Sequence, residues 1–316
     1  MCRSSDSFYQ KPEPFRGEVH GLVSKFVDVR HSEETLKKVQ DKQGLGTGSV
    51  RIHYATQQAK EGASHVVLIH ATGTTCKLFT TGEENLVSLF TAAGYCVTLV
   101  DLRGHGLSEL VPGPVSIRLL AADVAEALKV AHPGVSYHVV GVSVGFGTSM
   151  ALAADYPELC TSLNGNGFLF DRSKREFAVY LFSRGLLLRM LGMRRISKLV
   201  AFSLHTTEAR QAATLMPPVP LEGYIAVSKS WLGFNLHPML HNFQVPTCIL
   251  HPEYDSRLGH TETRHKKELA MMPKDLPTKF VHFPKYSHIM CIEKGGAKLM
   301  FDVWHEFMQE AESRKR

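Results

Sequence analysis

The chain has 316 residues, which is long enough for one large α/β domain with an insertion or for two smaller domains. Hydrophobic residues make up 44% and charged residues 21% of the sequence, and these ordinary proportions exclude general disorder. The formal net charge of +6 is modest for this length, and no recognisable nucleic-acid motif accompanies it, so we expect no nucleic-acid partner.

The cysteines and the N-terminal residues predict a soluble, cytoplasmic protein. The six cysteines are scattered without C-x-x-C spacing, which argues against a zinc site and against a disulfide framework. The first residues lack the apolar core of a signal peptide, and no run of about 18 apolar residues occurs anywhere. The cysteines are Cys2, Cys76, Cys96, Cys160, Cys248 and Cys291.

The N-terminal part combines a polar arm with a strand pair. Residues 1–20 are polar and contain prolines, and we expect a loosely ordered arm. Residues 22–30 and 49–55 alternate in hydrophobicity, which predicts two antiparallel strands joined across a polar, glycine-containing stretch.

The next segments predict a buried, mostly parallel sheet. HVVLIH at residues 65–70 and YCVTLV at residues 95–100 are near-continuous apolar runs, which are typical of strands buried on both faces. Strands that alternate with helical segments at this spacing favour a parallel sheet with helices on both faces. Further strands are predicted at residues 137–140, 161–169, 245–250 and 279–283, with a final helix over 296–310.

The chain is organised around residues 137–156, where a strand turns directly into a helix at Ser143. Gly141 and Gly145 remove the side chains that would collide with the neighbouring strand and helix, so the serine hydroxyl can stand at the sheet edge. The N-terminus of the following helix points its N–H groups at the same spot, where an oxyanion would be stabilised. This context makes Ser143 a candidate nucleophile.

Several motifs together resemble the α/β-hydrolase fold family. HATG after one strand resembles the His-Gly-x-Gly oxyanion loop, DLRGHGLS after the next resembles the D-x-R-G-x-G-x-S segment, and GVSVG resembles the nucleophile elbow. PTCILHPEYD and FPKYSHIMCIEK resemble the late acid and histidine segments. The match follows the family's chain order over residues 50–312, and it implies an α/β-hydrolase fold with a mostly parallel central sheet, flanking helices and a helical cap insertion.

The resemblance implies a catalytic triad of Ser143 as nucleophile, Asp255 as acid and His288 as general base. A serine hydroxyl needs a base to take its proton, and an imidazole needs a carboxylate to fix its tautomer. His288 lies in a loop between the strand at 279–283 and the last helix, where the fold brings a loop back over the elbow. His70 and His282 are interpreted as structural.

Two other carboxylates remain open as the acid. Glu253 is two residues from Asp255 and follows the same strand, and some relatives in this fold carry the acid after the strand beside the elbow, which would nominate Asp171. Three further charged residues in the motifs are interpreted as parts of turns and helix packing: Asp101, Arg103 and Asp123.

An oxyanion hole requires two backbone donors aimed at one oxygen. The fold places one on Val144, and the resemblance to His-Gly-x-Gly places the other on Thr72. Ala71 stands where the family usually has glycine. If that position needs a positive φ, alanine costs about 1 kcal/mol and the loop is displaced.

The alternation of predicted strands and helices is interrupted by an insertion at residues 171–242. We expect residues 1–170 and 243–316 to form the core domain and residues 171–242 to form a helical cap. Between Arg172 and Lys198 there are eight Lys or Arg residues and one acidic residue, interleaved with apolar ones. This pattern is that of ordinary amphipathic cap helices, or of a cap that binds a lipid-like acyl substrate or contacts an anionic membrane.

These features together predict a serine hydrolase that cleaves a carboxylic ester or thioester through an acyl-enzyme intermediate, without a metal or organic cofactor. Two alternatives stay open. The same triad and fold also carry out carbon–carbon bond hydrolysis, and a ligand receptor or scaffold can retain the fold with slow turnover.

Overall fold

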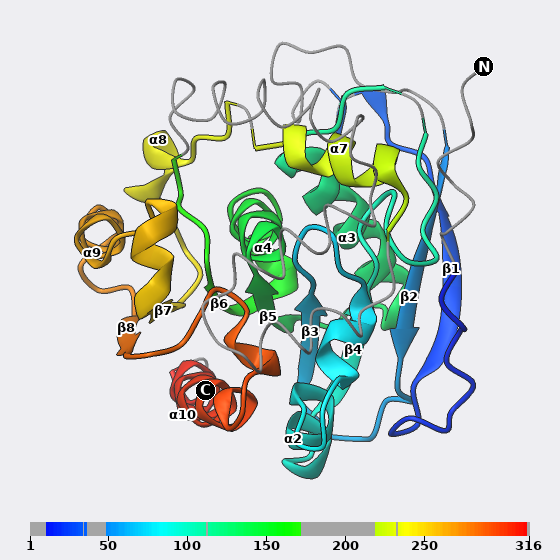
Figure 1. Ribbon diagram of the computed structural model, residues 1–316, viewed down its shortest axis with the longest axis horizontal. Coiled ribbons are helices and arrows are strands. Elements are labelled where there is room, and N and C mark those ends of the chain that lie inside the picture. Colours follow the sequence, from blue (N-terminus) through cyan, green and yellow to red (C-terminus); the bar gives the residue numbers. More distant parts are fainter. Residues whose placement is uncertain are drawn as a thin grey trace.

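The computed structural model describes residues 11–33, 35–36, 49–111, 113–171, 219–231 and 233–314. Within these residues, eight strands form one sheet in the order β1-β2-β4-β3-β5-β6-β7-β8 (Figure 1). β1 (Val23–Val29) pairs antiparallel with β2 (Val50–Thr56), and β2 pairs antiparallel with β4. All remaining pairs are parallel, so the predicted α/β class is confirmed.

The central strands are buried on both faces, as their apolar runs predict. In β3, Val67 and Ile69 pack into the core on one face, and Val66 and Leu68 pack into the core on the other. In chain order, the strands after β2 are β3 (His65–Ile69), β4 (Cys96–Val100), β5 (Tyr137–Val142), β6 (Cys160–Asn166), β7 (Thr247–Pro252) and β8 (Thr278–Phe283).

Helices cover both faces of the sheet. α2 (Leu86–Ala92) and α10 (Gly296–Ser313) pack on one face, whereas α3 (Ile117–Ala131), α4 (Val144–Asp155) and α9 (Glu262–Leu269) lie on the other (Figure 1). Two further helices lie between residue 218 and β7: α7 (Leu221–Lys229) and α8 (His237–Leu240). Short 3-10 helices are η1 (Cys76–Thr80), η2 (Pro157–Leu159), η3 (Glu253–Leu258) and η4 (Met290–Ile292).

Side-chain caps fix where the two early helices begin. The Asn85 side chain accepts a hydrogen bond from the Ser88 amide, and the Ser88 hydroxyl lies against the Asn85 amide, which forms a capping box at α2. Ser116 accepts from the Leu119 amide at the start of α3. These caps satisfy amide groups that have no partner inside the helix.

The charged residues of the DLRGHGLS segment support the fold, as predicted. Arg103 makes a bidentate ion pair with Asp123, with both contacts at 2.8 Å and both side chains buried. The carboxylate of Asp101 accepts from the amides of Cys76 and Leu107. Asp101 and Arg103 therefore tie the loop after β4 to η1 and to α3.

Part of the predicted N-terminal arm is packed against the domain. Phe15 is 4% exposed and belongs to the core on the α2 and α10 side. Its amide donates to the Ser24 hydroxyl, and its carbonyl accepts from the Ser24 amide. Residues 11–20 are thus held by an apolar anchor that their polar composition conceals.

Only the end of the predicted cap, residues 171–242, falls within the described structure. Residues 172–218, including the basic stretch from 172 to 198, lie outside the described residues. The part that follows is helical over α7 and α8. Across the described ranges, no helix combines the length and apolarity needed to span a membrane.

Candidate active site

The turn between β5 and α4 holds Ser143 in a strained conformation. Its φ is 57° and its ψ is −125°, a region that residues other than glycine rarely adopt. A Cβ on Gly145 would lie 2.0 Å from the Ile69 carbonyl oxygen, and one on Gly141 would lie 2.5 Å from the backbone of Gly145. The two glycines are therefore required by close backbone contacts, as the sequence predicted.

His288 contacts Asp255 directly. The His288 Nδ1 lies 2.7 Å from Asp255 Oδ1, and the carboxylate is fully buried while the histidine side chain is 18% exposed. The carboxylate can accept but not donate, so in the neutral ring Nδ1 carries the proton and Nε2 keeps its lone pair. This tautomer is the one that a general base requires.

The other two candidate carboxylates make different contacts. Glu253 accepts from the Lys285 amide at 2.7 Å, and the Tyr254 amide donates to the Tyr286 carbonyl. Both bonds join the loop after β7 to the loop that carries His288. Asp171 instead forms an isolated bridge with Asn235. Asp255 is thus the carboxylate in contact with His288.

Asn166 at the end of β6 connects the serine to the histidine. Its carbonyl accepts from the Ser143 amide, and its side-chain amide donates to the His288 carbonyl, both at 2.9 Å. A Cβ on the following Gly167 would lie 2.5 Å from the His288 ring. No hydrogen bond joins the Ser143 hydroxyl to this ring within the described chain; such bonds are often long in ligand-free enzymes.

The sequence did not single out Asn166, although the many polar residues in the predicted strand at 161–169, TSLNGNGFL, were a signal. A residue in a buried strand that carries an amide side chain needs partners for it. Asn166 finds one in the backbone of the histidine loop.

Ala71, in the loop after β3, does not need a positive φ. Among the described residues other than glycine, positive φ angles occur at His20, Ser143 and Lys285, so Ala71 is not in that region. The left-handed residue of this turn is Gly73, with φ of 79°. The predicted cost of alanine at this position is therefore absent.

Two backbone amides at this end of the sheet are candidate donors to an oxyanion. Neither the Thr72 amide nor the Val144 amide has a hydrogen-bond acceptor among the described residues. Val144 is the first residue of α4, where an amide has no partner inside its helix.

Helix α7 lies against the loops that follow β3 and β4. A Cβ on Gly73 would lie 2.9 Å from the ring of Tyr224, and one on Gly223 would lie 1.9 Å from the carbonyl oxygen of Gly104. The glycine in α7 allows this helix to approach the loop backbone closely. Sequence reasoning missed both α7 contacts because they join segments more than 100 residues apart.

A second histidine lies near the Asp255 carboxylate. His260 Nδ1 is 4.0 Å from Asp255 Oδ2, and the rings of His260 and His288 have centroids 5.8 Å apart. Burial raises the pKa of Asp255, but the charge and hydrogen bonds of His288 and His260 outweigh it, so the net pKa lies below the usual range of the carboxyl group. Asp255 therefore stays ionised at neutral pH.

Three groups of possible metal-ligating side chains occur among the described residues, each with ligand atoms within 4.8 Å of one another. The first group contains Asp255 and His288, which were described above. The second contains His53, whose Nδ1 lies 2.7 Å from the Asp101 carboxylate. The third lies at the opposite end of the strands. The groups are Asp255, His260 and His288; His53, Cys76 and Asp101; and His65, Cys96 and His132.

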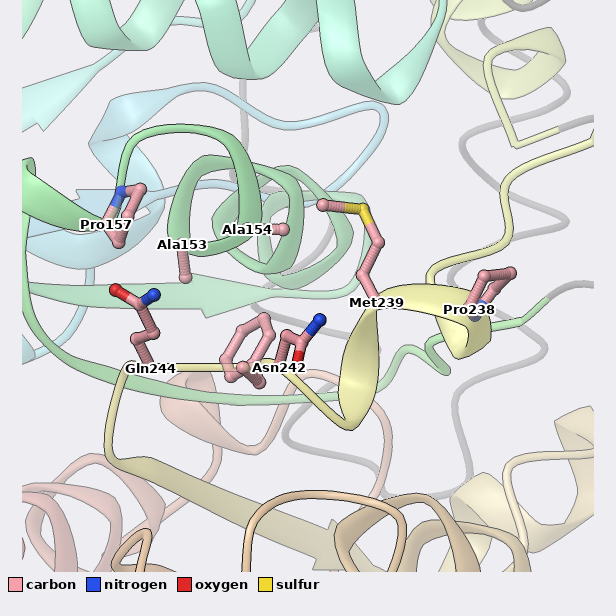
Figure 2. A pocket seen from close by; sticks show the side chains of 8 residues that line it. Ala153, Ala154, Pro157, Pro238, Met239, Asn242 and Gln244 are labelled. Atoms are coloured by element: carbon pink, nitrogen blue, oxygen red, sulfur yellow. The ribbon is translucent and has the colours of Figure 1, made fainter.

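Figure 2 shows a pocket between the end of α4 and the segment around α8, with Ala153, Ala154 and Met239 among its lining residues. Ser143 precedes the first residue of α4, ten positions before Ala153. At 1.5 Å per residue, the pocket lies about 15 Å along the helix from the serine. It is therefore separate from the candidate active site.

The strand order, the strained serine turn and the loop geometry define a protein class. Residues 64–168 match the family model of the alpha/beta hydrolase fold. The chain therefore has the α/β-hydrolase fold, as its motifs predicted.

Particular relatives differ in chemistry. The chain is 32% identical over 130 residues to a 2-hydroxy-6-oxononadienedioate/2-hydroxy-6-oxononatrienedioate hydrolase from Paraburkholderia phymatum, a match that spans 41% of this chain and 44% of that protein. The enol-lactonase of Burkholderia xenovorans LB400 has a TM-score of 0.68 at 22% identity, over 82% of this chain and 97% of that one. A thermophilic esterase from Thermogutta terrifontis has a TM-score of 0.69 at 17% identity, over 86% and 99%. At these identities the two structures establish the fold.

Proposed function

We propose that this protein is a serine hydrolase that cleaves a carboxylic ester or thioester, with Ser143 as nucleophile, His288 as base and Asp255 as the acid that orients it. The observation that carries the proposal is the 2.7 Å contact between His288 and the buried Asp255, on a loop that Asn166 fastens beside the serine turn. An arrangement of serine, imidazole and carboxylate is the general means of activating a hydroxyl.

In the proposed reaction, the Ser143 oxygen attacks the carbonyl carbon while its proton moves to Nε2 of His288. The resulting oxyanion is stabilised by the amides of Thr72 and Val144. His288 then gives the proton to the leaving alcohol or thiol as the bond to it breaks. Water hydrolyses the acyl-enzyme by the same steps in reverse, which releases the acid and restores Ser143.

Carbon–carbon bond hydrolysis is the second candidate, because the relative from Paraburkholderia phymatum is named for hydrolysis of 2-hydroxy-6-oxononadienedioate. The same nucleophile and base serve either reaction. What differs is that the leaving group is a carbanion, which must be stabilised by the substrate's own conjugated carbonyl groups.

A substrate comparison tests the proposal. Turnover of p-nitrophenyl esters of increasing acyl length is expected, with no turnover of 2-hydroxy-6-oxononadienedioate. Turnover of the dienedioate without any ester turnover would replace the main proposal by the second. If a fluorophosphonate probe labels the protein but neither substrate class turns over, the protein is better described as a ligand receptor on this fold.

The preference for a lipid-like acyl group, and contact with an anionic membrane, are proposals carried by the basic and apolar sequence between residues 172 and 198. Flotation with liposomes of zwitterionic or anionic lipid tests the membrane part. Absence of binding to both kinds of liposome would remove it.

A further inference from the structure

Two buried histidines cross-link the loop after β3 to the loop after β4. His70 follows β3, and its Nε2 lies 2.9 Å from the Leu102 amide. His105 follows β4, and its Nε2 lies 3.2 Å from the Gly73 amide. Each ring therefore accepts a hydrogen bond from the other's loop. The ring centroids are 5.4 Å apart, and both side chains are fully buried.

These contacts fix the tautomer of both rings. An amide can only donate, so both Nε2 atoms lack a proton and both Nδ1 atoms carry one. The Nδ1–H of His70 donates to the Ala71 carbonyl at 2.8 Å, and that of His105 faces the Arg103 carbonyl at 3.3 Å. Burial lowers the pKa of both rings, and with the neighbouring His70 it lowers the pKa of His105 to about 3. Both rings are neutral at physiological pH.

The bonds of His70 determine where the Thr72 amide points. The Ala71 carbonyl and the Thr72 N–H belong to one planar trans peptide, so they point in opposite directions. This carbonyl accepts from the His70 ring, and also from the amide and hydroxyl of Thr74 at 3.2 and 2.8 Å. With its carbonyl held by three donors, the peptide has one orientation.

His105 fixes the peptide on the other side of Thr72. The Gly73 amide, which belongs to the peptide between Thr72 and Gly73, donates to the His105 ring. Both peptides that flank the Thr72 side chain are thus held by histidines from two different loops. The Thr72 amide itself has no acceptor in the described part of the chain.

We propose that His70 and His105 are positioning residues that aim the Thr72 amide at the oxyanion formed on the substrate. The inference rests on the proposed function of the site. Stabilisation of an oxyanion requires donors already aligned where the charge develops, because realignment during the reaction would consume the gain. In this proposal, neither histidine ring touches the reacting atoms.

The test compares two substitutions at one position. His105→Leu removes the acceptor for the Gly73 amide, whereas His105→Gln offers a carbonyl oxygen near the place of Nε2. We expect His105→Leu to lower kcat for the best ester about 10- to 100-fold with KM nearly unchanged, and His105→Gln to restore kcat to within a few-fold of wild type.

A matched control separates this effect from loss of stability. His138 in β5 is also buried and hydrogen-bonded, to Ser162 at 2.8 Å, but it lies near the start of its strand, away from the loop. His138→Leu is expected to lower the melting temperature about as much as His105→Leu while leaving kcat intact. Equal kcat in His105→Leu and wild type, or an equal loss in His138→Leu, would overturn the proposal.

A measurement without substrate keeps this inference distinct from the proposed function. The ¹⁵N shifts of the ring nitrogens are expected to show the Nδ1–H tautomer for both histidines at pH 7. Protonation of either Nε2 would contradict the positioning role even in an active enzyme. Failure of the function itself would appear differently, as ester turnover that persists in Ser143→Ala.

Discussion

Two sets of residues at this end of the sheet use their histidines in different ways. On the reactive side, formed by Ser143, Asp255 and His288, the His288 ring has one nitrogen bound to a carboxylate, and its other nitrogen has no partner among the described residues. On the supporting side, formed by His70, Asp101 and His105, both nitrogens of each ring contact backbone groups. A ring with an uncommitted nitrogen can transfer a proton, whereas a ring with none can only hold its surroundings in place.

Burial suits a histidine for a structural role, and partial exposure suits it for proton transfer. His288 is partly exposed, and its neighbouring carboxylate would stabilise a transient positive charge. His70 and His105 are fully buried, and desolvation disfavours their charged forms. Changes on the reactive side should therefore alter rate with little effect on stability. Changes on the supporting side should alter stability and, where they release the Thr72 amide, rate as well.

Ser143→Ala gives the largest expected effect on rate. We expect kcat for any ester substrate to fall by a factor of at least about 10³, because the nucleophile is lost while oxyanion stabilisation remains. Labelling by a fluorophosphonate probe should disappear. Ser149→Ala, a buried serine of the same helix whose hydroxyl contacts the Gly145 carbonyl, should label as wild type does.

Asp255→Asn should have the next largest effect on rate. The amide side chain can favour the wrong tautomer of His288, and we expect kcat to fall about 10³- to 10⁴-fold with the unfolding midpoint little changed. Glu253→Gln is the matched control, since Glu253 lies two residues away and contacts a backbone amide instead. Equal losses in both variants, measured with the same ester, would show that the acid was assigned to the wrong residue.

Arg103→Met should act on stability. Removing the arginine leaves the buried Asp123 carboxylate without its bidentate partner, which costs about 3–5 kcal/mol. Arg118→Met breaks a pair with Asp155 in which the arginine is 29% exposed, and it should cost less. Urea unfolding of both variants measures the difference. A similar midpoint for the two would contradict the structural role of the Arg103 pair.

The lowered pKa of His105 should make the folded protein less stable at acid pH. Its folded pKa of about 3 lies below the ordinary value of 6.5, so at acid pH the unfolded chain binds a proton that the folded chain does not. The contribution of the neutral His105 ring to the free energy of unfolding is fully present above about pH 6.5 and is lost as the pH falls toward 3. His105→Gln should remove up to one proton from this slope, about 1.4 kcal/mol per pH unit, in unfolding series at pH 4–7. Parallel slopes would be inconsistent with a neutral, buried ring.

Ala71→Gly should have the smallest effect. Because Ala71 has an ordinary backbone conformation, glycine relieves no strain there and costs about 0.5–1 kcal/mol through the entropy of the unfolded chain. Thermal unfolding should reveal a slightly lower midpoint with kcat nearly unchanged. A raised midpoint would indicate that alanine is strained at this position after all.

The sequence predicted the fold well because its signals are local. Alternation predicted β1 and β2, and apolar runs predicted most of the buried strands, each to within a few residues of its observed bounds. The glycines around Ser143 identified the elbow. The serine turn and the loops of Asp255 and His288 were found because short motifs occur at the ends of recognisable strands. Composition misjudged the arm at 11–20, because one phenylalanine decides its packing.

Contacts between distant segments could not be predicted in the same way. The reciprocal bonds of His70 and His105 depend on how two loops pass each other, and no periodicity encodes that approach. The choice among Asp255, Glu253 and Asp171 likewise depended on the direction of a loop, which only coordinates give.

The double attachment of Asn166 has a consequence for how the site responds to change elsewhere. Its backbone carbonyl accepts a hydrogen bond from the serine turn, and its side-chain amide donates one to the histidine loop. One residue of a buried strand therefore fixes the positions of both. Substitutions in other segments of the chain can then change which molecules bind while the proposed reactive groups keep their spacing. Such separation allows this scaffold to acquire new specificities without rebuilding its chemistry.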